Sequence, residues 1–560
     1  MNRKQFIRMS GAALGALVTS RWSYAHSTYM PAATWEELAM PSKVEVVLDS
    51  GVFTLSGHGT YTYKDITVAI TNSSAGMHVS VHCPQAPLQF ILLEWAYPLQ
   101  TTVGILGDHW ERTYGDLQFQ PLDPDKKLPW YFIAHDGKSA TCIGVKTGCP
   151  VIASWQAGPD RLRLTMDARN GGAGVLLGDR TLHAADIVVV RGKGEENVFA
   201  TGRRFCHMLC EKPRLSRQPV YGVNDWYYAY GNNDPALIVK LTGIMSELAT
   251  DTNNRPFSVI DAGWAKYSPY HPGDGGWMDD FSQPNDKFKE GMDKVAADVR
   301  KLGMRPGIWT RPLCAKYNDP VSLLLPAIPG RDDRKYPILD PSIEENVERV
   351  RHNIRLYRQW GYELVKHDYT TYDILGKWGS QMKDDITSPG WHFADRTRTT
   401  AEITLALYKA IRDTAGDALY IIGCNTFSHL GAGIFELSRV GDDTSGKEWG
   451  RTKKMGVNTL GFRMIQHDNF YAADGDCVGL TKDVPWEKNK QWMQLLAGSG
   501  TPLFISPQPE VLGAEQKQTI RDSFTRAARR QPPGEPLDWL TSSQPAKWKL
   551  DGEIRTFDWG

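Results

Sequence analysis

The 560-residue sequence lacks an excess of either charge. It contains 64 Lys and Arg against 64 Asp and Glu, and no long run of one sign interrupts this balance. Neutrality of this kind argues against nucleic acid or an anionic membrane as the main partner, because both attract clustered positive charge. The sequence also lacks Gly-x-Gly-x-x-Gly and Gly-x4-Gly-Lys-Ser/Thr segments, so no motif supports nucleotide binding.

Cysteine is scarce, with eight residues in the chain and none in the C-x2-C spacing of a zinc site. Cys206 and Cys210 are four residues apart with His207 between them, which on a helix would place both sulfurs on one face. We interpret them as small buried hydrophobic side chains rather than metal ligands.

Long apolar runs are also missing, because no stretch approaches the 20 or so residues that span a bilayer. Residues 1–25 instead resemble an export signal, with Arg3, Lys4 and Arg8 before a short apolar stretch and Ser23-Tyr24-Ala25 as a cleavage site. The order Arg3-Lys4-x-Phe6-Ile7 is similar to a twin-arginine signal with Lys in second place. We therefore expect a periplasmic or secreted protein that has no membrane association after cleavage.

What the sequence does contain indicates a globular protein of several domains. Hydrophobic residues make up 41%, and the length exceeds that of one hydrophobic core. Residues 27–215 are rich in β-branched and alternating segments between Gly, Asn, Asp and Pro turns, which predicts a β-sandwich. Residues 216–534 alternate short apolar runs with helical periodicity, which predicts a (β/α)8 barrel with a doubly wound sheet as the alternative. Residues 535–560 predict a short C-terminal β segment.

In a (β/α)8 barrel the active site lies at the carboxyl ends of the strands, so polar residues just after each apolar run are candidates. They are Asp261, Lys366, Asp368, Cys424, Arg439, Asp442 and Asp443. Two converging carboxylates suit retaining glycoside hydrolysis, in which one acts as nucleophile and the other as acid and then base. On an extended strand Lys366 would point to the same side as Asp368 and favour its ionised form, but an ordinary ion pair at the barrel rim is an equal alternative.

Several motifs in order along residues 219–510 resemble glycoside hydrolase family 36 α-galactosidases and their relatives in family 27. Lys366-His-Asp368, Gly423-Cys424 and Arg439-Val-Gly-Asp442-Asp443-Thr444 are similar to that family's Lys-x-Asp, Gly-Cys and Arg-Ile-Gly-x-Asp-Thr. Further matches are Gly222-Val-Asn-Asp-Trp226, Ile260-Asp-Ala-Gly-Trp264, Gly307-Ile-Trp309 and Gly500-Thr-Pro-Leu-Phe-Ile-Ser506.

The resemblance implies a role for each matched residue. Asp368 would be the nucleophile and Asp443, rather than its neighbour Asp442, the general acid/base. Lys366 and Arg439 would bind sugar hydroxyls and stabilise the carboxylates. Asp261 would bind hydroxyls at the closed end of the pocket, Cys424 would line it, and Trp226 and Trp309 would form its apolar walls, with barrel core as the alternative for both.

One departure from the family motif concerns the sugar. The family has two adjacent Asp residues where this chain has Asp261-Ala262, so one carboxylate expected to hold the 4- and 6-hydroxyls of galactose is missing. A lost partner for a buried hydroxyl should weaken or change sugar selection. The sequence therefore predicts retaining cleavage of an α-galactoside or a related glycoside, without metal or cofactor. A β-L-arabinopyranoside, an α-N-acetylgalactosaminide, transfer to another sugar, and a sugar-binding protein without turnover remain alternatives.

Three other features read as structural. His367 should face away from Lys366 and Asp368 because side chains alternate along a strand. Asp474 and Asp476 have a spacing that hints at calcium, but the further ligands of an EF-hand are absent, which favours a turn. We interpret Asp373, Asp384 and Asp385 as solvated charges in loops.

Overall fold

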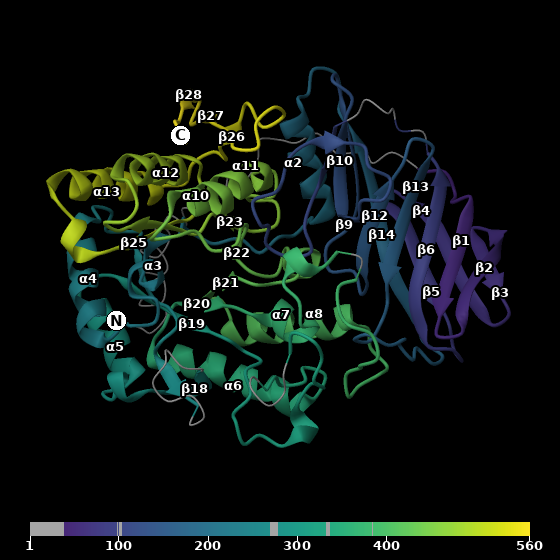
Figure 1. Cartoon of the computed structure of the whole chain (residues 1–560), viewed down its shortest axis with the longest axis horizontal. Coiled ribbons are helices and arrows are strands. Elements are labelled where there is room, and N and C mark those ends of the chain that lie inside the picture. Colours follow the sequence, from purple (N-terminus) through teal and green to yellow (C-terminus); the bar gives the residue numbers. More distant parts are fainter. Residues whose placement is uncertain (1–37, 98, 100–103, 269–277, 332–336, 384) are drawn as a thin grey trace, which may run out of the picture. The chain divides into compact units, whose positions relative to one another are not determined.

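A large antiparallel sheet forms the first part of the computed structural model, which describes residues 38–97, 99, 104–268, 278–331, 337–383 and 385–560 (Figure 1). The predicted export signal lies outside these residues. The strand order is β8-β7-β10-β11-β14-β5-β4-β3-β2-β1-β6-β13-β12-β9. Their bounds are β1 (Lys43–Leu48), β2 (Gly51–His58), β3 (Thr60–Tyr63), β4 (Ile66–Ser73), β5 (Gly76–His82), β6 (Leu88–Ala96), β7 (Gly104–Gly107), β8 (Gln120–Pro121), β9 (Leu128–Pro129), β10 (Tyr131–His135), β11 (Ala140–Val145), β12 (Ile152–Ala157), β13 (Arg161–Asp167) and β14 (Thr181–Arg191).

Strand β2 divides this sheet into two halves, because its first residues pair with β1 and its last three pair with β3. Alternating burial along β4, as in Ile66, Val68 and Ile70, gives the sheet one apolar face. The two halves contact each other through Phe132 on β10 and Trp155 on β12, whose ring centroids are 6.2 Å apart.

Helix α2 (Val198–Leu209) follows this sheet, in a segment for which only strands were predicted. Asn197 caps it by accepting the Ala200 N–H, and Phe205 and Cys206 are among its buried residues. The helix packs on β11 and β14. The eight cysteines all lie within the described residues and are buried, in agreement with the interpretation of Cys206 and Cys210 as core residues.

A curled parallel sheet forms the second part, with the order β23-β22-β21-β20-β19-β16-β15-β25-β24. The order begins with β23 and ends with β24, which follow each other in the chain with only Gly475 and Asp476 between them. The strands are β15 (Tyr221–Asn224), β16 (Phe257–Ile260), β19 (Arg305–Thr310), β20 (Leu364–His367), β21 (Tyr420–Gly423), β22 (Leu437–Arg439), β23 (Ala472–Asp474), β24 (Cys477–Leu480) and β25 (Leu503–Pro507). Their short and almost entirely buried sequences are typical of strands covered on both faces.

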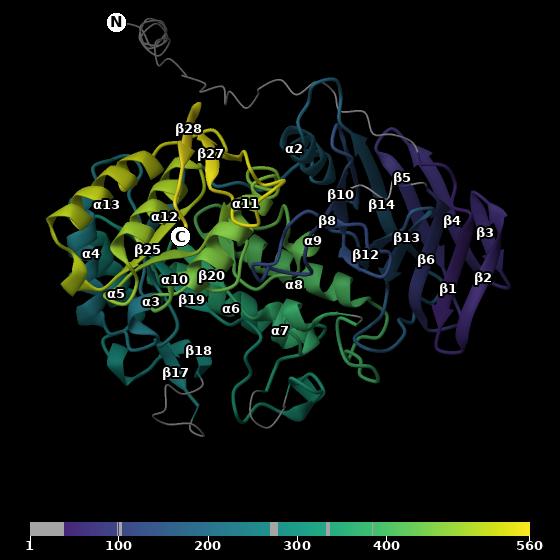
Figure 2. The same ribbon diagram turned by 45° about the horizontal axis from the view of Figure 1, so that its top comes forward.

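Helices alternate with these strands along the chain and cover them (Figures 1 and 2). Helix α4 packs on β15 and β16, α5 on β19, and α12 on β24 and β25. The longer ones are α4 (Pro235–Leu248), α5 (Met292–Lys301), α6 (Glu344–Trp360), α8 (Thr400–Ala415), α12 (Trp486–Gly498) and α13 (Ala514–Ala527), and the shorter ones α3 (Trp226–Ala229), α7 (Thr370–Leu375), α9 (Ser428–Gly431), α10 (Trp449–Thr452) and α11 (Thr459–Arg463). The predicted alternation of strand and helix is confirmed.

Local sequence signals explain where the helices begin and end. Helix α8 starts at a capping box, in which Thr399 accepts the Glu402 N–H and Glu402 accepts the Thr399 N–H. Helix α6 carries acidic residues in its first turn and ends at Gly361, whose φ of +95° suits glycine.

No helix in the described part of the chain combines the length and hydropathy that crossing a bilayer requires.

Two small sheets complete the fold. A hairpin of β17 (Ala265–Tyr267) and β18 (Met278–Pro284) follows β16. The last described strands, β26 (Glu535–Pro536), β27 (Lys547–Leu550) and β28 (Glu553–Thr556), lie within the predicted C-terminal β segment. The domain boundaries stay predictions, since the described residues belong to one compact unit.

Candidate active site

Asp368 lies directly after β20, at the carboxyl end of the parallel sheet. Its Oδ2 accepts the Trp309 indole N–H at 3.1 Å, and its Oδ1 accepts the Tyr369 backbone N–H at 2.8 Å. Tyr369 has a φ of +69°, a left-handed conformation that costs a residue other than glycine roughly 1–3 kcal/mol. Such strain clusters at functional sites, and here it adjoins the carboxylate that the sequence predicts to be the nucleophile.

Lys366 pairs with Asp261 across the sheet rather than with Asp368, two residues away. Its Nζ lies 2.7 Å from Asp261 Oδ2, which also accepts the Asn224 amide N–H at 2.7 Å. Burial lowers the pKa of Lys366, but the negative charge of Asp261 and the effects of other neighbouring groups together outweigh this, so the pKa lies well above its ordinary value. The ammonium and the carboxylate thus form a fixed polar pair beside the candidate nucleophile.

Asp443 is the more open of the two candidate catalytic carboxylates, with 40% of its side chain exposed. Its Oδ1 accepts a hydrogen bond from Arg439 Nη2 at 3.2 Å. Burial raises the pKa of Asp443, but Arg439, Arg112 and Lys366 together lower it to about 2. The group is therefore ionised at neutral pH when no sugar is bound.

Asp476 anchors the segment that carries Asp443. It lies between β23 and β24, and its Oδ2 accepts the N–H of Thr444 at 2.8 Å, the hydroxyl of Thr444 at 2.9 Å and the hydroxyl of Tyr227. The same oxygen lies 3.0 Å from Arg439 Nη2. The predicted turn between Asp474 and Asp476 therefore positions the residue next to Asp443.

Arg112 enters this site from the segment between β7 and β8, and no sequence motif marks it. Its Nη2 lies 2.8 Å from Asp442 Oδ1, and its Nη1 lies 4.0 Å from Asp368 Oδ1. Its guanidinium also lies over the Trp378 ring, 5.2 Å from the centroid. Two backbone hydrogen bonds hold the segment in place. The N–H of Thr113 donates to the carbonyl of Val440, and the carbonyl of Thr113 accepts from the N–H of Asp442.

Cys424 follows β21 and accepts hydrogen bonds from both Arg112 and Arg439. Its Sγ accepts from Arg112 Nη1 at 3.6 Å and from Arg439 Nη1 at 3.5 Å. Burial raises the pKa of the thiol well above its ordinary range, and the charge of Asp368 adds to this. The thiol is thus neutral and serves as a buried acceptor in the network that links Asp368 with Asp443.

Asp442 differs from Asp443 in having both of its oxygens engaged. Arg112 holds one of them, and Arg451 Nη2 lies 2.9 Å from the other. A carboxylate held by two guanidiniums is poorly placed to exchange a proton with a substrate. Of the two neighbours, Asp443 therefore has the geometry of an acid/base group.

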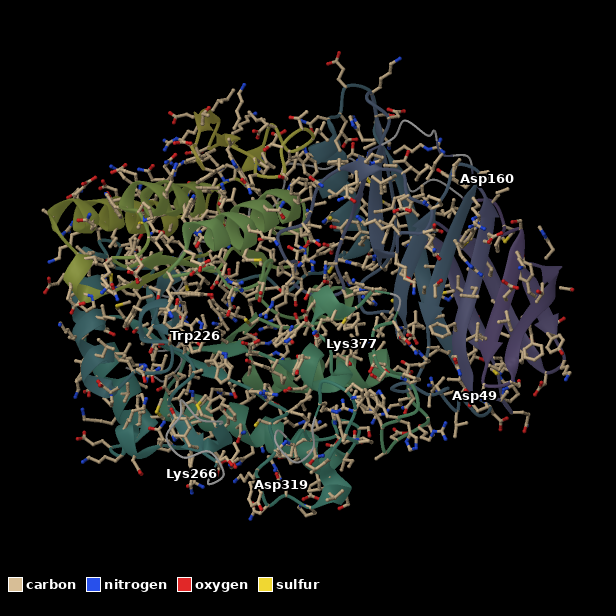
Figure 3. All side chains as sticks on the ribbon, in the orientation of Figure 1. Asp49, Asp160, Trp226, Lys266, Asp319 and Lys377 are labelled. Atoms are coloured by element: carbon tan, nitrogen blue, oxygen red, sulfur yellow. The ribbon has the colours of Figure 1, made fainter. Side chains whose placement is uncertain are left out.

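The two tryptophans expected as pocket walls occupy different positions. Trp309, on β19, is buried and holds Asp368 through its indole N–H. Trp226, labelled in Figure 3, is half-buried in α3 and meets Tyr230 edge-on with ring centroids 5.7 Å apart. Trp264 is fully buried and donates to the Trp309 carbonyl at 2.9 Å, so it belongs to the core.

A second carboxylate lies behind Asp261, although position 262 holds alanine. Asp225 Oδ1 accepts the Asp261 backbone N–H at 2.8 Å, and Oδ2 accepts the Asn233 amide at 2.9 Å. Burial and the charge of Asp261 raise the pKa of Asp225 to about 7. Because both oxygens are occupied, Asp225 supports the backbone of Asp261 instead of replacing the missing carboxylate.

The interpretation of Asp373 as a solvated loop charge is wrong. Its carboxylate is buried and forms a two-bond ion pair with Arg311, whose guanidinium also covers the Tyr369 ring. Asp385 lies in a loop as predicted, but it pairs with buried Arg169 at 2.6 Å. Asp384 lies outside the described residues. His367 is buried against Tyr408 and Phe435 on the side away from Asp368, as expected.

The fold is similar to that of glycoside hydrolase family 36 α-galactosidases in solved structures. An α-galactosidase from Thermus thermophilus, in complex with p-nitrophenyl α-D-galactopyranoside, has a TM-score of 0.59 at 18% identity, over 92% of this chain and 99% of that one. A variant of the family 36 α-galactosidase AgaA from Geobacillus stearothermophilus, in complex with raffinose, has a TM-score of 0.60 at 14% identity. The match covers 91% of this chain and 79% of that one. No protein-family model and no curated protein sequence matches the chain.

Proposed function

We propose that the protein is an exported retaining glycoside hydrolase that removes terminal α-galactosyl or closely related α-linked sugars. One observation supports this most directly. Asp368 and Asp443 follow two strands of the curled sheet, and a single network of Arg112, Cys424 and Arg439 connects them. We interpret the curled sheet as a (β/α)8 barrel beside a β-sandwich. The similar structures with bound galactosides agree with this proposal.

In the first step Asp368 attacks the anomeric carbon while the bond to the leaving oxygen breaks. The indole of Trp309 and the backbone N–H of Tyr369 hold the attacking carboxylate in position, which lowers the entropic part of the barrier. Asp443 gives its proton to the leaving oxygen, and the sugar remains as an ester on Asp368.

In the second step Asp443, now ionised, takes a proton from a water molecule, and the oxygen of that water attacks the anomeric carbon. The ester to Asp368 breaks and the sugar leaves with its original anomeric configuration. Lys366 and Asp261 are placed to bind sugar hydroxyls, and Arg439 stabilises Asp443 in its ionised form. No step requires a metal or a cofactor.

The sugar can be identified with activated α-galactoside, β-L-arabinopyranoside and α-N-acetylgalactosaminide substrates, all with the same leaving group. We expect turnover on at least one, and proton NMR of the first product should show the anomer of the substrate. Ala262→Asp should shift kcat/KM between panel members, because it restores a carboxylate at the closed end of the pocket. Absence of release on every sugar would contradict the hydrolase proposal and favour a sugar-binding protein, while transfer products with added acceptor would indicate transglycosylation.

Arg112 offers a separate test of the site. We expect Arg112→Met to lower kcat/KM by roughly 10²-fold, the usual effect of removing one preorganised donor from an active site. It should also raise the pKa of Asp443, since one of the cations that lower this pKa is gone. Arg451→Met is the matched control, because Arg451 also holds Asp442 but contacts neither Asp368 nor Cys424. Equal losses in the two variants, measured with unchanged Tm, would show that Arg112 acts only by holding Asp442.

A further inference from the structure

A β-bulge brings two histidines and an aspartate together on the antiparallel sheet, in the neighbouring strands β5 and β14 (Figure 1). In the register, Ser80 lies opposite His183, Val79 opposite Ala185, and His78 opposite Asp186. Ala184 is therefore an extra residue in β14. Residues three apart on a regular strand face opposite sides, and the extra residue is what places His183 and Asp186 on the same side.

The three side chains present their donor atoms to one another. Asp186 Oδ1 lies 2.6 Å from His78 Nδ1 and 3.5 Å from His183 Nε2, and all three donors lie within 4.8 Å of one another. Ligands about 2.1 Å from a tetrahedral ion are about 3.4 Å apart, so the separation of Asp186 from His183 suits one shared ion. The shorter contact between His78 and Asp186 is a hydrogen bond, which would lengthen when the ion binds. In the described part of the chain this is the one group of His, Cys, Asp and Glu residues with such a geometry.

The surroundings allow such an ion to enter. The side chains of His78 and His183 are each 45% exposed, and that of Asp186 is 35% exposed, so further positions around an ion remain open to water. The two imidazoles are stacked, with centroids 3.6 Å apart. Their rings must turn about the Cβ–Cγ bond to aim both nitrogens at one point, and this exposure permits the rotation.

We propose that His78, His183 and Asp186 form a binding site for a divalent transition ion of the Zn²⁺ class that links β5 to β14. Two imidazoles and one carboxylate suit Zn²⁺, Ni²⁺ or Cu²⁺, whereas Mg²⁺ and Ca²⁺ prefer oxygen ligands. The site shares no residue with the one around Asp368 and Asp443, so the proposal does not depend on glycoside hydrolysis. Its effect would be to stabilise the folded sheet, because an ion that binds only the folded chain raises Tm.

Calorimetric titration of the EDTA-treated full-length protein with ZnCl2 tests the proposal. We expect one equivalent to bind to the wild type, and Asp186→Asn and His183→Gln each to weaken this binding by at least about tenfold. His82→Gln is the matched control, because His82 lies on β5 but outside the cluster, and it should leave Zn²⁺ affinity unchanged. MgCl2 should produce no binding at this site.

Thermal unfolding with and without ZnCl2 provides a second measurement. Zn²⁺ should raise the Tm of the wild type and of His82→Gln, but not that of Asp186→Asn, while all three should have similar Tm values without metal. The proposal would be overturned if Asp186→Asn and His183→Gln bound Zn²⁺ as tightly as the wild type, since any observed binding would then belong to other residues.

Discussion

Asp368→Asn should lower turnover by on the order of 10⁴-fold or more on every glycoside that the wild type cleaves, as loss of a covalent nucleophile does in other enzymes. The amide cannot form the glycosyl ester, so no choice of leaving group compensates for it. The Asn side chain has nearly the same size, so the fold should survive, but its single oxygen replaces only one of the two acceptors that bind the Trp309 indole and the Tyr369 backbone N–H.

Intact-mass spectrometry after brief incubation with an activated, slowly hydrolysed glycoside gives the direct measurement. The wild type should gain the mass of one glycosyl group, and peptide mapping should place it on Asp368, whereas Asp368→Asn should gain none. Asp385→Asn is a suitable control, because Asp385 pairs with Arg169 and contacts none of the candidate catalytic residues. A glycosyl group found on another carboxylate, or unchanged labelling of Asp368→Asn, would refute the assignment of the nucleophile.

Much of the fold could be predicted because it depends on local signals. Short buried runs such as Leu364-Val365 and helices with clear caps, such as the one that starts after Thr399, repeat along the chain at the spacing of a parallel α/β fold. The candidate carboxylates could be predicted for the same reason, since parallel strands place their carboxyl ends together. The separate strands β23 and β24 were not predicted, and Asp476 between them contacts Thr444 and Tyr227, which are distant in sequence.

The electrostatics of the site could not be predicted from spacing, because they depend on partners that are distant in sequence. Lys366 is two residues from Asp368 but pairs with Asp261, 105 residues away. Arg112 lies 312 residues from Cys424 and comes from a segment without a recognised motif. Asp373 has the sequence surroundings of a surface residue, and its ion pair with the distant Arg311 offsets the cost of its burial, since a buried carboxylate needs a paired cation.

The two tryptophans show that the direction in which a side chain points also cannot be predicted from spacing along the sequence. Trp226 and Trp309 both lie in motifs that resemble those of family 36, so the resemblance implied one role for both. The Trp309 indole donates to Asp368 and therefore orients the candidate nucleophile, whereas Trp226 packs against Tyr230. Which way an indole points is decided by packing on neighbouring strands, and no pattern along one strand carries that information.

Asp443→Ala should have an effect that depends on the leaving group, unlike Asp368→Asn. For glycosides with poor leaving groups we expect a loss of roughly 10²–10⁴-fold, the usual contribution of general acid catalysis. For glycosides with an activated leaving group, which departs without a proton, the first step should be nearly unaffected. Added azide should then increase turnover, because this anion can attack the glycosyl ester without a general base.

The pH dependence of the wild type should reveal the same residue. In the first step Asp443 must be protonated, and its pKa lies below the ordinary value in the empty site because Arg439, Arg112 and Lys366 outweigh the effect of burial. The protonated fraction therefore falls as pH rises, and kcat/KM on poor leaving groups should increase toward acidic pH. Arg112→Met, which raises this pKa, should move the decline to higher pH.

Asp442→Ala is the matched control for Asp443→Ala, because it removes the neighbouring carboxylate while leaving the acid in place. Its loss frees Arg112 and Arg451, so some activity should disappear, but by the same factor for good and poor leaving groups. The dependence on the leaving group would therefore separate proton transfer from general damage to the site. If Asp442→Ala, and not Asp443→Ala, showed that dependence, the acid/base role would belong to Asp442, and the two guanidiniums that hold it would have to release it when sugar binds.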